Sequence, residues 1–108
     1  MPLSAPMPAA SEPGRSPLGR SSAEELARTL RAVADPTRLQ LLSVVLGSAD
    51  GRATVGQVAE ALGLRQPTVT HHVRILVEDE LLVREREGKY VWLSVAADRL
   101  AAIEDLLR

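Results

Sequence analysis

Two short helices separated by only three residues constrain the fold of this 108-residue chain more than any other feature. The first is expected to begin at a capping box, Thr54 with Gln57, and to end at Gly63, the residue type that closes helices in the left-handed conformation. Its apolar positions recur at helical spacing: Val55, Val58, Ala59 and Leu62. The second is expected over residues 66–79, with Pro67 in its first turn and with Val69, Val73 and Leu76 facing the core. Two helices joined so closely predict a helix-turn-helix unit.

Two further helices are expected upstream of this unit. The first should begin at Ser22, because Ser22 and Glu25 have capping-box spacing, and it presents Leu26, Leu30 and Val33 on one face. Asp35 is the expected N-cap of the second helix and Pro36 its first residue. Its predicted buried stripe, before a loop at 47–51, consists of Leu39, Leu42 and Leu46.

Downstream of residue 79 the apolar period changes from 3.6 to 2. Residues 82–86 and 90–94 alternate around Glu87, Gly88 and Lys89, which predicts a β-hairpin in which Tyr90 and Trp92 are core residues. Residues 97–107 are expected to form an amphipathic terminal helix with Leu100, Ile103 and Leu107 as its apolar stripe. The expected fold is mainly α with a small β-hairpin: a winged helix-turn-helix of about five helices and a two-stranded wing.

Composition divides the chain in two and excludes several classes of function. Residues 1–21 form a Pro/Ser/Ala-rich tail that is expected to be disordered, and residues 22–108 form the domain. A domain this small predicts association with a second copy. With no cysteine, thiolate metal sites and disulfides are excluded. Short apolar runs and the lack of a signal-peptide pattern predict a cytoplasmic protein without a membrane span, and no catalytic motif indicates an enzyme.

The outer face of the helix at 66–79 carries the best candidate chemistry. Its polar side chains near the helix N-terminus suit base edges in the major groove: Gln66, Thr68, Thr70, His71 and Arg74. The alternative is an ordinary solvated helix face. Adjacent residues on a helix point about 100° apart, so His71 and His72 do not predict a metal site, and His72 is interpreted as a packed side chain.

The hairpin predicts a wing that contacts the sugar-phosphate backbone. The candidate backbone contacts, together with the residue before the helix, are Arg65, Arg86, Gly88 and Lys89. Between residues 65 and 89, acidic residues balance the basic ones, so no basic patch is visible. This balance keeps a second hypothesis open, that the winged helix is a protein-interaction module. The first two turns of the helix at 66–79 nevertheless contain no acidic residue.

Four segments in order resemble the ArsR/SmtB family of bacterial transcription regulators. They are Ala-Asp-Pro-Thr-Arg-Leu at 34–39, Thr-Val-Gly-Gln-Val-Ala-Glu-Ala-Leu-Gly-Leu at 54–64, Gln-Pro-Thr-Val-Thr-His-His-Val at 66–73 and Arg-Glu-Gly-Lys-Tyr at 86–90. The resemblance implies a homodimer that binds an inverted-repeat operator, usually as a repressor, and is often released by a metal ion. The first and last helices would form the dimer interface, through Leu26, Leu30, Leu100, Ile103 and Leu107.

The departures from the family pattern concern mainly metal sensing. Thr54 and Gly56 stand where soft-metal sensors of the family have a cysteine pair, and residues 97–99 (Ala-Asp-Arg) lack the histidine of an Asp-x-His pair. No metal site or cofactor is therefore predicted. Weak nickel or zinc binding through carboxylates and histidine, a co-regulator protein that senses the metal, and a small-molecule signal remain alternatives.

Two further departures lie beside the helix expected at 66–79. Arg65 stands where a serine N-cap is common in the family. Glu80 replaces a glycine in the turn before the wing, so either Glu80 adopts a left-handed conformation or the turn changes.

Overall fold

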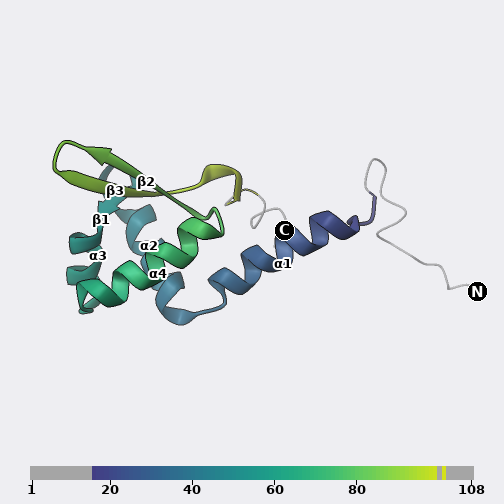
Figure 1. Ribbon diagram of the computed structural model, residues 1–108, viewed down its shortest axis with the longest axis horizontal. Coiled ribbons are helices and arrows are strands. Elements are labelled where there is room, and N and C mark those ends of the chain that lie inside the picture. The colour runs from purple at the N-terminus through teal and green to yellow at the C-terminus, as the bar shows by residue number, and fades with distance from the viewer. Residues whose placement is uncertain (1–15, 100, 102–108) are drawn as a thin grey trace, which may run out of the picture.

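The computed structural model describes residues 16–99 and 101 (Figure 1). The elements in chain order are α1 (Arg20–Val33), α2 (Pro36–Gly47), the 3-10 turn η2 (Ala49–Gly51), β1 (Arg52–Thr54), α3 (Val55–Leu62), α4 (Gln66–Glu78), β2 (Leu82–Glu87) and β3 (Tyr90–Val95). Residues 97–99 and 101 are helical, as expected for the start of the terminal helix. Most of the predicted tail, together with Leu100, Ile103 and Leu107, lies outside the described residues. Helix α1 extends away from the unit formed by α2, α3 and α4 (Figure 1).

Helix α1 begins two residues before its predicted start. Gly19 is its N-cap, and the Gly19 carbonyl accepts the first helical hydrogen bond, from the Ala23 N–H at 2.9 Å. Ser22 therefore lies inside the helix, and the prediction of a capping box there was wrong. An ion pair between Arg20 and Glu24, 3.1 Å long, spans the first turn instead.

Helix α2 begins as predicted but buries a different face. The Asp35 side chain accepts a hydrogen bond from the Arg38 N–H at 3.0 Å, and Pro36 occupies the first turn. The buried residues are Leu41 and Val45, whereas Leu39 and Leu46 are 52% and 48% exposed. Of the predicted stripe, Leu42 is partly buried against the core, and the prediction was wrong for Leu39 and Leu46. Helix α2 is apolar around most of its circumference, so its contacts with α3, β1 and β3 select the buried face.

Three strands, rather than two, form the antiparallel sheet, in the order β1-β3-β2. The hairpin was predicted within one residue at each end, and Gly88 turns it with φ +60°. Strand β1 was missed because three residues are too few to show a period of two. It pairs Ala53 with Leu93, and both side chains are fully buried.

The same register corrects the interpretation of the aromatic residues. Leu93 takes the inner face of β3, so its neighbour Trp92 points to the opposite face, and Tyr90, two residues earlier, lies there too. Tyr90 is 52% exposed and Trp92 only half-buried, and their rings lie 6.2 Å apart. The prediction that they belong to the core was therefore wrong.

The helix-turn-helix unit has the predicted local structure. Both hydrogen bonds of the capping box are present: the Gln57 N–H donates to Thr54 Oγ1 at 3.1 Å, and the Thr54 N–H donates to Gln57 Oε1 at 3.0 Å. Gly63 ends α3 with φ +67°. Val58 and Ala59 from α3 pack in the core with three residues of α4: Val69, Val73 and Leu76. No helix among the described residues is long and apolar enough to cross a membrane.

Candidate nucleic-acid interface

Helix α4 presents a polar face whose orientation its buried side sets. Val69 and Leu76 are fully buried and Val73 nearly so, which fixes the helix against α3 and α2. All five residues predicted to read bases are exposed on the remaining surface: Gln66, Thr68, Thr70, His71 and Arg74. The first turn contains no acidic residue, so the positive end of the helix dipole is not neutralised there. Such a face suits the edges of bases and a phosphate backbone.

Arg65 precedes α4 as its N-cap. Its backbone is extended, with φ −77° and ψ 146°, and its side chain makes no capping hydrogen bond. The Arg65 carbonyl accepts the first helical bonds, from Thr68 and Val69. The side chain is exposed beside the polar face of α4, where it can reach a phosphate.

His72 is half-buried, in agreement with its interpretation as a packed residue. Its Nδ1 lies 3.5 Å from Nη1 of Arg38, and the Arg38 Nε–H donates to the Ala32 carbonyl at 2.6 Å. Arg38 thus connects the end of α1 and the start of α2 to α4. Sequence reasoning did not identify this role, because His72 lies 34 positions along the chain from Arg38.

The wing places its predicted contacts at the tip of the hairpin. Arg86, Gly88 and Lys89 are all exposed, and Arg86 Nη1 donates to the Gly88 carbonyl at 3.5 Å. Lys89 Nζ lies 5.5 Å from the ring centroid of Tyr90, which is also exposed near the tip. Tyr90 is therefore part of the exposed surface at the wing tip. It was not among the predicted contacts, because Tyr90 was expected in the core.

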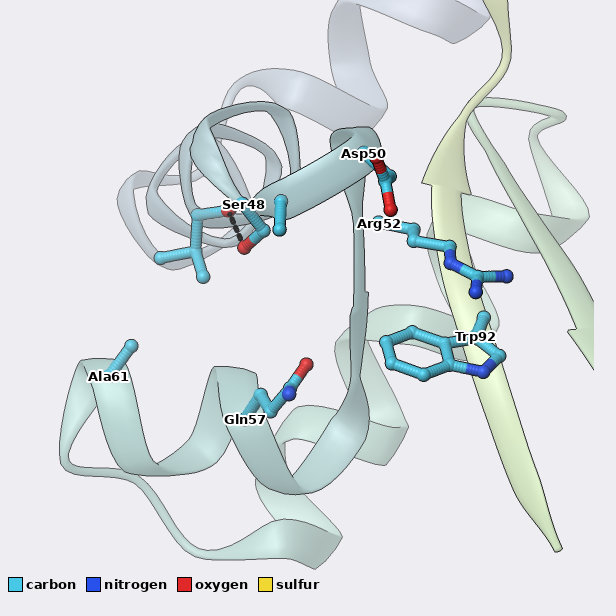
Figure 2. A pocket seen from close by; sticks show the side chains of 8 residues that line it. Ser48, Asp50, Arg52, Gln57, Ala61 and Trp92 are labelled. Atoms are coloured by element: carbon cyan, nitrogen blue, oxygen red, sulfur yellow. Dashed lines mark hydrogen bonds between the residues drawn. The ribbon is translucent and has the colours of Figure 1, made fainter.

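The outer face of the sheet carries an ion pair and a stacked guanidinium. Arg52 lies 4.3 Å from the ring centroid of Trp92, and its Nη1 donates to Oε2 of Glu87 at 2.8 Å. This hydrogen bond lowers the pKa of Glu87 and raises that of Arg52. Figure 2 shows the Arg52 guanidinium above the Trp92 indole. Sequence reasoning assigned no role to Arg52.

A small pocket lies beside this stacked pair. Its volume is about 310 Å³, and Ser48, Gln57 and Ala61 line it together with Arg52 and Trp92 (Figure 2). Among the described residues that line this pocket, Asp50 is the one His, Cys, Asp or Glu, which is too few to hold a metal ion. Among residues 16–99 and 101, no three His, Cys, Asp or Glu side chains form a group that could do so.

One guanidinium joins the terminal helix to α1 and to the turn that follows α4. Arg99 Nη2, at the start of the terminal helix, lies 2.9 Å from Oε1 of Glu80 and 3.4 Å from Oε2 of Glu25 in α1. The bond to Glu80 is the largest cause of a raised pKa at Arg99. Glu80 has φ +63°, the left-handed alternative expected for a residue in place of glycine.

The predicted dimer face is described only in α1. Leu26 is half-buried, and Leu30 is 37% exposed. Leucines left partly exposed along one helix suit an interface with a second copy.

Comparison with known proteins agrees with this geometry. Residues 33–85 match a family model described as a helix-turn-helix domain. The regulator NmtR of Mycobacterium tuberculosis is 34% identical over 89 residues, which cover 82% of this chain and 72% of NmtR. The transcriptional repressor SdpR of Bacillus subtilis is 32% identical over 65 residues, which cover 60% of this chain and 69% of SdpR.

Solved structures show the same fold. HlyU from Vibrio cholerae superimposes with a TM-score of 0.72 at 26% identity, over 82% of this chain and 94% of HlyU. The homodimeric winged helix-turn-helix domain Mb0332 from Mycobacterium bovis, a possible ArsR-family regulator, gives 0.69 at 26% identity, over 89% and 86%.

The fold and the exposed face of α4 thus define a winged helix-turn-helix DNA-binding protein. The chain belongs to the ArsR/SmtB family of transcriptional regulators.

Proposed function

We propose that the protein is a repressor that binds an inverted-repeat operator as a homodimer, acting in the cytoplasm as a regulator rather than an enzyme. The exposed polar face of α4 is the observation that carries this proposal. The opposite face of α4 is buried in the core, so the polar face is free to contact DNA, and the same domain also contains the wing. In the proposed complex Gln66, Thr70 and Arg74 read base edges in the major groove. Arg86 and Lys89 contact the DNA backbone.

The proposed dimer uses α1 and the terminal helix. The partly exposed Leu26 and Leu30 support this interface, and Mb0332, a protein of similar fold, is homodimeric. A two-fold symmetric dimer presents two copies of α4, which matches the symmetry of an inverted repeat.

The test compares a base-reading residue with a backbone contact by fluorescence anisotropy. The DNA is the duplex upstream of the protein's own gene, with a scrambled duplex for comparison. Arg74→Ala should weaken binding by about 1–3 kcal/mol and relax specificity at one position. Lys89→Ala should weaken binding to both duplexes alike and reduce the salt slope by about one.

Arg20→Ala is the matched control, since Arg20 is an exposed arginine at the far end of α1. It should leave binding to both duplexes unchanged. If the Arg74→Ala variant binds the operator as tightly as the wild type, Arg74 does not read a base. Equal affinity of the wild type for both duplexes would refute the function and favour a protein-interaction module.

We also propose that the protein regulates without a tight metal site of its own. A relative from Streptomyces lividans, 39% identical over 82 residues, is a probable mercury resistance operon repressor. This sequence contains no cysteine, so it cannot supply the thiolate ligands that soft metals prefer. For nickel and zinc, which histidine and carboxylate also bind, residues 97–99 lack the histidine of an Asp-x-His pair, and no suitable group of side chains lies among residues 16–99 and 101. Binding to the upstream duplex should therefore be the same in chelator and in added nickel or zinc. A metal-dependent change in affinity would overturn this proposal.

A further inference from the structure

The wing has little packing to hold its tip. Strand β2 is buried only at Leu82, and residues 83–87 are all exposed. On β3, the fully buried residue is Leu93, three positions after Tyr90 at the tip. A two-stranded ribbon is marginally stable by itself, so core packing alone does not set the direction of the tip.

One side chain crosses the sheet and reaches the tip. Arg52 lies on β1 and pairs in register with Ser94 of β3. Strand β3 separates β1 from β2. The Arg52 guanidinium stacks 4.3 Å from the ring centroid of Trp92 on β3 and binds Glu87 at 2.8 Å. Glu87 is the last residue of β2 and directly precedes Gly88 and Lys89. A single arginine thus spans all three strands and is anchored in the centre and at the far end.

The arginine also connects the wing to the helix-turn-helix unit. Strand β1 ends at Thr54, which is the N-cap of α3. The buried Ala53 fixes β1 in the core between Arg52 and Thr54. Contacts of Arg52 with the wing therefore define the position of the tip relative to α3, which packs on α4.

We propose that Arg52 is a positioning residue for DNA binding, which holds the wing tip and Lys89 where they contact the backbone by stacking on Trp92 and binding Glu87. This inference rests on the proposed function. It assigns a positive role to Glu87, an acidic residue at the tip whose charge, taken alone, opposes DNA binding.

Glu85 provides the matched control for Glu87. Both are exposed acidic residues on the same strand and, two positions apart, on the same face, where Glu85 pairs with Trp92 in register. Among the described residues, Glu87 forms an ion pair with Arg52, whereas Glu85 forms no ion pair and its charge contributes less to the raised pKa of Arg52. If only charge matters, Glu85→Gln and Glu87→Gln both tighten DNA binding. If Glu87 acts through Arg52, only Glu85→Gln tightens binding, and Glu87→Gln weakens it.

The DNA experiment measures the affinity of full-length variants for the upstream and scrambled duplexes by anisotropy. Arg52→Gln should weaken binding to the upstream duplex by about fivefold, the effect of one exposed ion pair with a cation–π contact. Arg52→Lys should recover part of the loss, because lysine still pairs with Glu87. In a Lys89→Ala background the effect of Arg52→Gln should nearly vanish, since both substitutions remove the same tip contact.

A measurement without DNA reports the stacked pair directly. Trp92 is the single tryptophan of the chain, so its fluorescence and its quenching by acrylamide follow this one site. Arg52→Gln and Glu87→Gln should both increase quenching, and Glu85→Gln should leave it near the wild-type value.

Several outcomes would overturn the inference. Tighter DNA binding by the Glu87 variant would show that its charge alone matters. A loss on Arg52→Gln that persists in the Lys89→Ala background and lowers the salt slope would show a direct phosphate contact. Unchanged affinity with a lower melting temperature would show a purely structural role. If the wild type does not prefer its upstream duplex, the proposed function fails as well, whereas these other results refute the role of Arg52 alone.

Discussion

Asp35 stabilises the junction of α1 and α2 through its charge. Its carboxylate accepts the Arg38 N–H at 3.0 Å and lies 4.0 Å from the Arg38 guanidinium. The backbone hydrogen bond is the main reason that the pKa of Asp35 falls below its ordinary value of 3.8, although partial burial opposes the shift. Because the folded pKa is depressed, the ionised carboxylate stabilises the folded state above pH 3.8, and this contribution is lost as the pH falls through the folded pKa.

Asp35→Asn isolates this charge, because asparagine is also a good N-cap. The variant should be less stable than the wild type at about pH 7, and the difference should narrow at an acidic pH below 3.8, as the Asp35 carboxylate takes up a proton. Urea unfolding at both pH values, followed by circular dichroism, measures the difference. A difference that is the same at both pH values would show that the charge of Asp35 has no role.

Glu80 is strained at the backbone while its side chain binds Arg99. The left-handed conformation costs free energy for a residue with a Cβ, whereas glycine adopts it freely. Glu80→Gly and Glu80→Ala both lose the 2.9 Å contact with Arg99, so their difference reports the backbone alone. The glycine variant should be more stable than the alanine variant by about 1 kcal/mol in urea unfolding. Equal stability would show that the turn relaxes without strain.

Among the α-helices described in full, α3 is the shortest, at eight residues. A helix of two turns has few hydrogen bonds of its own, so its cap contributes much of its stability. Thr54→Ala removes the acceptor for the Gln57 N–H and should lower the free energy of unfolding by about 1 kcal/mol. Thr54→Ser keeps the hydroxyl and should stay close to the wild type. Chemical denaturation of both variants makes the comparison, and equal losses would exclude the cap as the cause.

The buried face of helix α2 depends on tertiary contacts. Its leucines and valines offer more than one apolar stripe, and the chosen face consists of Leu41 and Val45. Contacts with other elements, rather than its own pattern, decide which stripe is buried.

For the whole molecule, the proposed dimer links two recognition helices into one binding unit. Leu30→Glu places a charge on the exposed part of α1. Because Leu30 lies outside the core, the monomer should keep its fold by circular dichroism while sedimentation velocity shows dissociation. Affinity for the inverted repeat should then fall by about 100-fold or more, since the second half-site is no longer bound intramolecularly.

Gln40→Glu adds the same charge at an exposed position of α2 and serves as the control. It should remain dimeric and bind the upstream duplex like the wild type. A Leu30→Glu protein that sediments as a dimer would exclude α1 from the interface.

The sequence by itself determined the features that depend on neighbours a few residues apart. The capping box of Thr54 and Gln57, the Asp35 cap, the left-handed Gly63 and the hairpin around Gly88 all involve contacts within one turn. The five exposed positions of α4 follow from the same local period, because burial of one helix face exposes the other.

Only the tertiary structure decided which surfaces face each other. Strand β1, the buried face of α2 and the outward position of Tyr90 and Trp92 depend on partner elements distant in sequence. Arg52 meets Glu87 across 35 positions, and Arg99 meets Glu25 across 74. Local periodicity predicts that a charge or an apolar face is present. Which residues contact that charge or that face depends on packing, because packing brings distant segments together.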